Sequence, residues 1–147
     1  MADKIILQVA AKALIVNNDG KVLILREPAK NNLGSQHGLY GLVGGRIDAN
    51  EDFETALYRE VAEETGLKIK PLYPIFVGEW YPTIGGKKHH IVAVFTVCEA
   101  KTTKVKLSIE HDDYQWIDPN DVKQFPFMPP DDQVVGRYAK WQKRLGN

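Results

Sequence analysis

The chain has 147 residues, close to the length of one typical domain. Its 19 Lys and Arg balance 19 Asp and Glu, with 44% hydrophobic and 26% charged residues. This composition excludes a disordered chain, and the zero net charge disfavours a general nucleic-acid-binding protein. No apolar stretch reaches the roughly 18 residues of a membrane span, residues 1–4 lack a signal peptide's apolar region, and Cys98 is the single cysteine. We therefore expect one cytoplasmic domain over residues 1–147, without a membrane partner.

The first part of the chain predicts two strands followed by a glycine-rich loop. Residues 5–16 and 21–25 are rich in aliphatic and β-branched side chains, and the Asp19-Gly20 pair between them is a hairpin turn signal. The loop glycines are Gly34, Gly38, Gly41, Gly44 and Gly45.

A central helix is predicted over residues 51–65, with Asn50 as its cap and Gly66 at its end. Further strands are expected around residues 68–81, 89–98 and 114–117, with a turn at residues 85–86. A closing helix is expected from the Pro-Pro-Asp-Asp segment at residues 129–132 to about Arg144. This order predicts an α/β fold with a mixed β-sheet.

Three carboxylates continue the apolar stripe of the central helix. At 100° per residue, Glu60, Glu63 and Glu64 lie in line with Leu57, which should face the core. Like charges at this spacing destabilise a helix by roughly 0.2–0.5 kcal/mol per pair, and Arg59 is the one local counter-charge. A solvated acidic face is one interpretation. A site for Mg²⁺ or Mn²⁺ accounts better for the inward direction.

The spacing around these carboxylates is specific. From Gly45 the chain has five residues, Glu51, seven residues, and then Arg59-Glu60-Val61-Ala62-Glu63-Glu64-Thr65-Gly66-Leu67. This pattern resembles the Nudix box, the signature of the MutT-like Nudix hydrolases, at every defining position. The resemblance implies a Nudix-type α/β/α sandwich and metal-dependent hydrolysis of a phosphoric anhydride bond in a nucleotide, with Mg²⁺ or Mn²⁺ as cofactor.

The resemblance also implies roles for individual residues. The metal ligands would be Glu60, Glu63, Glu64 and the carbonyl of Gly44. Arg59 would orient the carboxylates and pair with Glu51, while Gly45 and Gly66 shape the box. The base that removes a proton from water would be Glu60 or Glu110, which lies in a later loop and is alternatively an exposed turn residue.

Four residues are candidates for substrate binding. Arg26 could bind a phosphate or simply end an exposed strand. Residues 126–132 resemble the segment with which oxidised-purine triphosphatases of this family present two aspartates, here Asp131 and Asp132, to the purine edge. Such residues also suit a helix N-terminus. Tyr40 is a candidate stacking wall or a core residue.

The sequence is compatible with three functions. The leading one is hydrolysis of a nucleoside triphosphate to monophosphate and pyrophosphate, with an oxidised purine such as 8-oxo-dGTP as a candidate substrate. The second is cleavage of ADP-ribose or another nucleoside diphosphate sugar. The third, a non-catalytic Nudix-like sensor, is disfavoured because no box residue is missing. The expected partner is a small nucleotide, not a nucleic acid, and a homodimer is a candidate assembly.

Overall fold

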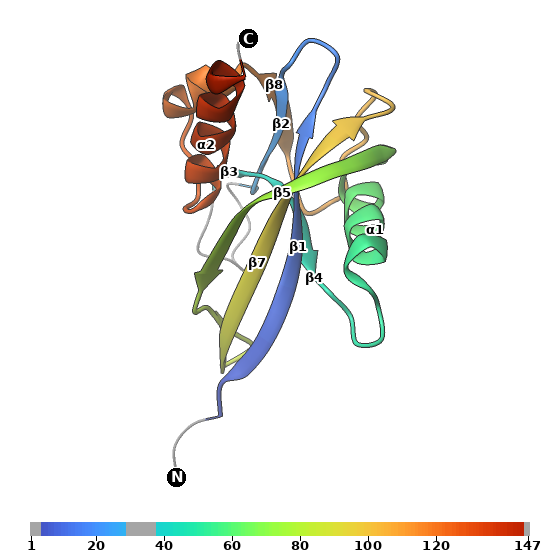
Figure 1. Cartoon of the computed structure of the whole chain (residues 1–147). Helices are drawn as coiled ribbons and strands as arrows, with labels where there is room; N and C mark the ends of the chain where they lie inside the picture. Colours follow the sequence, from blue (N-terminus) through green and yellow to red (C-terminus); the bar gives the residue numbers. More distant parts are fainter. Residues whose placement is uncertain (1–3, 29–37, 146–147) are drawn as a thin grey trace.

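The computed structural model describes residues 4–28 and 38–145 (Figure 1). Its strands are β1 (Ile6–Val16), β2 (Val22–Arg26), β3 (Tyr40–Gly41), β4 (Val43–Arg46), β5 (Ile69–Trp80), β6 (Thr83–Ile84), β7 (Lys87–Ala100) and β8 (Asp113–Ile117). Its helices are α1 (Phe53–Thr65), the short 3₁₀ helix η1 (Pro119–Gln124) and α2 (Asp131–Arg144). The predicted strands and helices occur in the predicted order, but the predicted glycine-rich loop contains β3 and β4, and η1 was not predicted. Gly34 of the predicted glycine-rich loop lies outside the described residues.

The sheet is mixed, as predicted. Its central path runs β3-β2-β1-β7-β5, and β4, β6 and β8 pair with β1, β7 and β2 respectively. Strands β1 and β7 are parallel along the whole of β1, whereas the other strand pairs are antiparallel. The predicted hairpin after β1 is present, but β1 and β2 pair only at Val16 and Val22. Further along, β1 pairs instead with β4, from Ala10 to Ala13.

The two α-helices lie on opposite faces of the sheet (Figure 1). Successive residues of β1 show why, because a strand points alternate side chains to opposite faces. Leu14 belongs to the core beneath α2, and Ile15 belongs to the core beneath α1. Cys98 is fully buried in the core beneath α1. Within the described ranges, neither helix has the length and apolar character needed to cross a bilayer.

The start of α1 differs from the prediction. The cap is Asp52, whose carboxylate accepts a hydrogen bond from Thr55 N at 2.9 Å. Asn50 instead adopts a φ of 67° in the preceding turn, and Glu51 remains outside the helix, where it accepts from Asp48 N. The predicted end is confirmed, since Gly66 has a φ of 72° and its N–H bonds to Ala62 O at 2.9 Å.

Candidate active site

Glu64 is the innermost of the helix carboxylates. It lies in the last turn of α1 and is 7% exposed. Its Oε1 accepts a hydrogen bond from Gly44 N at 2.8 Å. Burial raises the pKa of Glu64 to about 8, because desolvation disfavours the charged form. A nearby cation would therefore be needed to stabilise the charged form of this carboxylate.

The two glycines of β4 bring the strand close to both β1 and α1. Gly44 has a φ of 136°, and a Cβ there would lie 2.2 Å from Ala11 O. A Cβ on Gly45 would lie 2.7 Å from Oε1 of Glu60. The double glycine therefore lets the main chain of β4 approach the carboxylates of α1 closely.

Arg59 organises the outer part of the site. Its Nε and Nη2 bind the two oxygens of Glu51 at 2.6 and 2.9 Å, so the ion pair implied by the resemblance is present. Its Nη1 donates to Glu60 at 3.1 Å and to Glu63 at 3.2 Å. Glu63 lies at the rim with a side chain that is 59% exposed, in contrast to Glu60 at 14%. Burial raises the pKa of Glu60.

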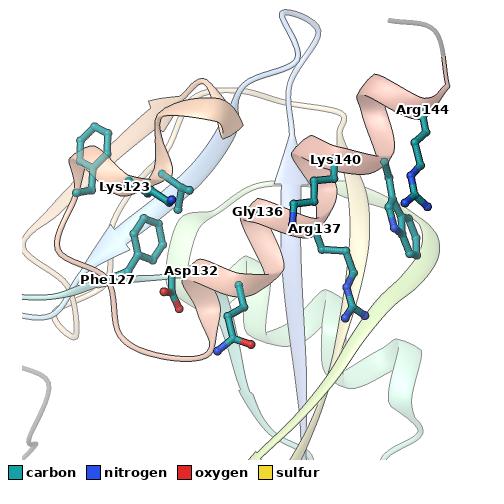
Figure 2. Close-up of a pocket in the computed structure, with 11 residues that line it drawn as sticks. Lys123, Phe127, Asp132, Gly136, Arg137, Lys140 and Arg144 are labelled. Carbon is teal, nitrogen blue, oxygen red and sulfur yellow. The ribbon is translucent and has the colours of Figure 1, made fainter.

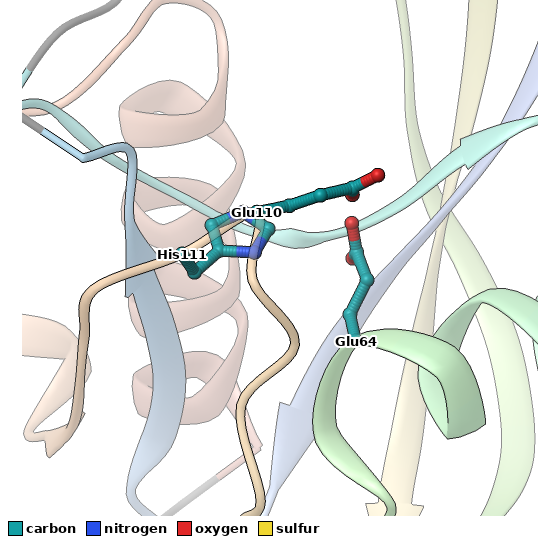
Figure 3. Close-up of side chains that lie close together, drawn as sticks. All are labelled: Glu64, Glu110 and His111. Atoms are coloured by element: carbon teal, nitrogen blue, oxygen red, sulfur yellow. The ribbon is translucent and has the colours of Figure 1, made fainter. Parts of the chain in front are cut away.

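The loop between β7 and β8 brings Glu110 to Glu64 (Figure 3). Ser108 N donates to Glu64 O at 3.3 Å, which ties this loop to the end of α1. Carboxylate oxygens of Glu64 and Glu110 and one ring nitrogen of His111 all lie within 4.8 Å of one another. Burial, assisted by Lys12, lowers the pKa of His111 to about 4, so the imidazole is neutral near pH 7. Sequence reasoning missed His111, although it adjoins Glu110.

Lys12 is a second residue that sequence reasoning missed. It lies in the middle of β1, where its Nζ donates to Leu42 O at 2.9 Å and lies 3.7 Å from Oδ2 of Asp131. Its charge opposes the burial-driven rise in the pKa of both Glu64 and Asp131. The available signal was a single lysine inside an apolar strand, since such a residue needs a buried partner.

The two adjacent aspartates of α2 have different surroundings. Asp131 is 2% exposed, and its Oδ2 accepts from Leu42 N at 2.7 Å. Asp132 is exposed and lines a groove of about 730 Å³ on the outer side of α2 (Figure 2). The cations of this groove are Lys123, Arg137, Lys140 and Arg144. Asp132 is therefore the more accessible of the two carboxylates.

Arg26 and Tyr40 are paired residues of the neighbouring strands β2 and β3. Arg26 Nε donates to Asp112 at 2.7 Å, and its guanidinium carbon lies 5.9 Å from the centroid of the Tyr40 ring. Tyr40 is 5% exposed, with its hydroxyl on Asp113 and its ring edge-on to Phe125. The ring of Tyr40 is thus packed in the core, which was the alternative interpretation.

Removal of the Lys12 charge has a predictable cost. Lys12→Met leaves the carboxyl group of Asp131 buried beside an apolar chain, so we expect the free energy of unfolding to fall by about 3 kcal/mol at pH 8. Burial raises the pKa of Asp131; hence the folded variant gains stability by binding a proton, and the loss shrinks towards pH 5. Urea unfolding at both pH values, in EDTA, measures this.

A double variant supplies the control for this experiment. Asp131→Asn keeps an oxygen that can accept from Leu42 N and removes the charge, so it should restore at least half of the stability that Lys12→Met loses. If Lys12→Met lowers the free energy of unfolding equally in the unaltered chain and in the Asp131→Asn variant, Lys12 has no specific interaction with this carboxylate.

The ligand atoms that the described residues offer at this site suit a divalent cation. Carboxylate oxygens and main-chain carbonyls are the donors that Mg²⁺ and Mn²⁺ prefer. Here the buried carboxylate of Glu64 has a raised pKa, and Glu110 lies close enough to share an ion with it. Nδ1 of His111 is buried without a hydrogen-bond partner in this part of the chain. The cluster thus includes at least one potential metal-ligand atom that makes no hydrogen bond to the described residues.

Fold and site together define a hydrolase of the Nudix type, with a carboxylate and histidine cluster that could hold a metal ion. The family model described as NUDIX domain matches residues 6–138. The chain therefore belongs to the Nudix family and is a pyrophosphohydrolase of that family, which confirms the resemblance seen in the box.

Similar proteins agree with this assignment. The CTP pyrophosphohydrolase of Escherichia coli (strain K12) is 30% identical over 123 residues, covering 81% of this chain and 82% of the relative. Nucleoside triphosphatase NudI of Escherichia coli O139:H28 is 28% identical over 118 residues, covering 76% and 82%. Among solved structures, the MutT protein from Methanosarcina mazei Go1 matches with a TM-score of 0.79 at 25% identity, covering 97% of this chain and 99% of that one.

Proposed function

We propose that this enzyme hydrolyses nucleoside triphosphates to monophosphate and pyrophosphate with Mg²⁺ or Mn²⁺. The observation that carries the proposal is the convergence of Glu64 and Glu110, from α1 and from the β7–β8 loop, beside the glycines of β4. Two relatives, a CTP pyrophosphohydrolase and a nucleoside triphosphatase, support triphosphates as the substrate class.

The proposed division of labour follows from the contacts. The residues that would hold the cation are Glu60, Glu63, Glu64 and the carbonyl of Gly44. When bound, the cation neutralises phosphate charge and makes water more acidic. Arg59 is a positioning residue, because it links Glu51 to Glu60 and Glu63.

The hydrolytic step needs one proton acceptor. Water oxygen bonds to phosphorus as the bond to the pyrophosphate leaving group breaks, and the proton passes to a carboxylate. Glu60 and Glu110 are the two candidate bases. Glu60 already accepts a hydrogen bond from Arg59, while Glu110 is exposed.

For the base of the nucleotide we propose an oxidised purine such as 8-oxo-dGTP, read by Asp132. The carboxylate of Asp131 is engaged by Leu42 N and Lys12, whereas that of Asp132 is exposed and able to accept hydrogen bonds from a purine edge. Asp132 and Phe127 both line the groove, so an aromatic ring lies in the same groove as this carboxylate (Figure 2).

A substrate panel tests both levels of the proposal. Canonical triphosphates, CTP, 8-oxo-dGTP, ADP-ribose, nucleotide sugars and dinucleoside polyphosphates are incubated with Mg²⁺ or Mn²⁺, and the products are identified by mass. We expect triphosphates to yield monophosphate and pyrophosphate. Cleavage confined to ADP-ribose or nucleotide sugars would support the second interpretation, and inertness towards the whole panel would favour a sensor.

Asp132→Ala tests the selectivity for the base. We expect the ratio of kcat/KM for 8-oxo-dGTP over dGTP to fall about tenfold, the scale of one lost hydrogen bond to a charged group. Asp19→Ala, in the exposed turn after β1, is the matched control and should leave this ratio unchanged. An unchanged ratio in Asp132→Ala would remove Asp132 from base recognition without affecting the triphosphatase proposal.

A further inference from the structure

His111 occupies the carboxylate site without an assigned role. One of its ring nitrogens lies within 4.8 Å of carboxylate oxygens of Glu64 and Glu110 (Figure 3). His111 N donates to Ser108 O at 3.3 Å, and Ser108 N donates to Glu64 O at the same distance. Main-chain hydrogen bonds therefore hold the ring beside the end of α1.

The ring has a donor atom that the protein leaves unused. Nδ1 of His111 is buried and has no hydrogen-bond partner among the described residues. A buried polar atom without a partner destabilises the fold, because it has lost its contacts with water. The neighbouring cation, Lys12, does not meet this need, because its Nζ donates to Leu42 O and lies against Asp131. An ion shared with Glu64 and Glu110 would use the lone pair.

Nitrogen and oxygen donors select different cations. Mg²⁺ strongly prefers oxygen and dehydrates reluctantly, whereas a neutral imidazole suits transition-series dications. A site made of carboxylates alone has little basis for such a choice. Adding one imidazole to two carboxylates shifts the site towards ions that accept both kinds of donor.

We propose that His111 supplies a nitrogen ligand to the metal site formed with Glu64 and Glu110, and that this ligand makes the site favour Co²⁺ and Mn²⁺ over Mg²⁺. The inference rests on the metal site of the proposed function, which it extends from Glu64 to the neighbouring Glu110. It adds a ligand from the β7–β8 loop and a preference between cations that the carboxylates alone do not provide.

Direct metal binding tests this inference without relying on turnover. Co²⁺ is titrated into the whole metal-free chain and followed by visible absorption and calorimetry, Mn²⁺ by electron paramagnetic resonance, and Mg²⁺ by calorimetry. His111→Asn replaces the nitrogen donor with an oxygen donor. We expect its Kd for Co²⁺ and Mn²⁺ to rise at least about tenfold, its Co²⁺ absorption bands to shift, and its Kd for Mg²⁺ to stay nearly unchanged.

His90→Asn is the matched control. His90 lies on β7 and also has a buried ring nitrogen, Nε2, that finds no hydrogen-bond partner within residues 4–28 and 38–145. It stacks on Tyr81 and faces Glu79 instead of the carboxylate site. We expect His90→Asn to bind all three cations like the unaltered protein. Circular dichroism and thermal unfolding verify that both variants are folded.

The outcomes separate this inference from the proposed function. Unchanged Co²⁺ affinity and absorption in His111→Asn would overturn the nitrogen ligand, and so would an equal loss of affinity for Co²⁺ and Mg²⁺. Glu64→Gln is measured alongside. If it binds all three cations like the unaltered chain, the proposed metal site itself is wrong. If it loses binding while His111→Asn does not, only the role of His111 is wrong.

Discussion

Glu60→Gln and Glu64→Gln are each expected to lower kcat with Mg²⁺ at least ~10²-fold, the scale on which acid–base and electrostatic groups act. Glutamine keeps the volume of each side chain but removes the charge that a cation requires. Glu64 is buried against Gly44 N, and Glu60 lies between Arg59 and Gly45. Steady-state kinetics on the best triphosphate of the panel, with the cation titrated, measures the effect.

Glu54→Gln is the control on the same helix, because Glu54 is exposed in the first turn of α1 and contacts only Tyr58 among the described hydrogen bonds. It should retain the activity of the unaltered chain. Near-normal rates in both Glu60→Gln and Glu64→Gln would mean that the metal site has been assigned to the wrong residues.

The same measurements distinguish the two candidate bases. If Glu110 accepts the proton, Glu110→Gln lowers kcat at saturating cation, whereas Glu60→Gln mainly changes the dependence of the rate on cation concentration. The reverse pattern would assign the proton transfer to Glu60.

Gly44→Ala, one residue before the box, is expected to be strongly destabilising. The alanine would have to adopt a φ of 136°, and its Cβ would lie 2.2 Å from Ala11 O and 2.7 Å from Cα of Lys12. Both contacts are with the main chain of the central strand β1, which cannot move without disturbing the sheet. Backbone strain and overpacking each cost about 1–3 kcal/mol. Together they should lower the free energy of unfolding by about 4 kcal/mol or prevent folding, as measured by urea unfolding or soluble yield.

Gly20→Ala is the control that separates the cost of backbone strain from the cost of a steric clash. Gly20 also has a positive φ, 73°, but a Cβ there meets nothing within 4 Å. We expect a loss of only about 1–2 kcal/mol from backbone strain. If Gly44→Ala loses no more stability than Gly20→Ala, the close approach of β4 to β1 does not constrain residue 44.

Local patterns were sufficient to predict much of the fold. The aliphatic and β-branched runs of β1 and β2, the turn after β1 and the end of α1 at Gly66 all depend on neighbouring residues, and the structure confirms them. The cap of α1 was missed because Asn50 and Asp52 are both good capping residues. The choice between them depends on Glu51, which stays outside the helix to bind Arg59, eight residues further along.

The sequence by itself determined the Nudix family and the carboxylates of α1, because the box is a contiguous segment whose spacing is set by helix geometry. Only the tertiary structure decided which distant residues join them. Lys12 and His111 reach the site from β1 and from the loop before β8. The structure also separated Asp131, held by Leu42 N, from the exposed Asp132. Such contacts arise from strand pairing and packing between residues far apart in the chain, which local spacing does not encode.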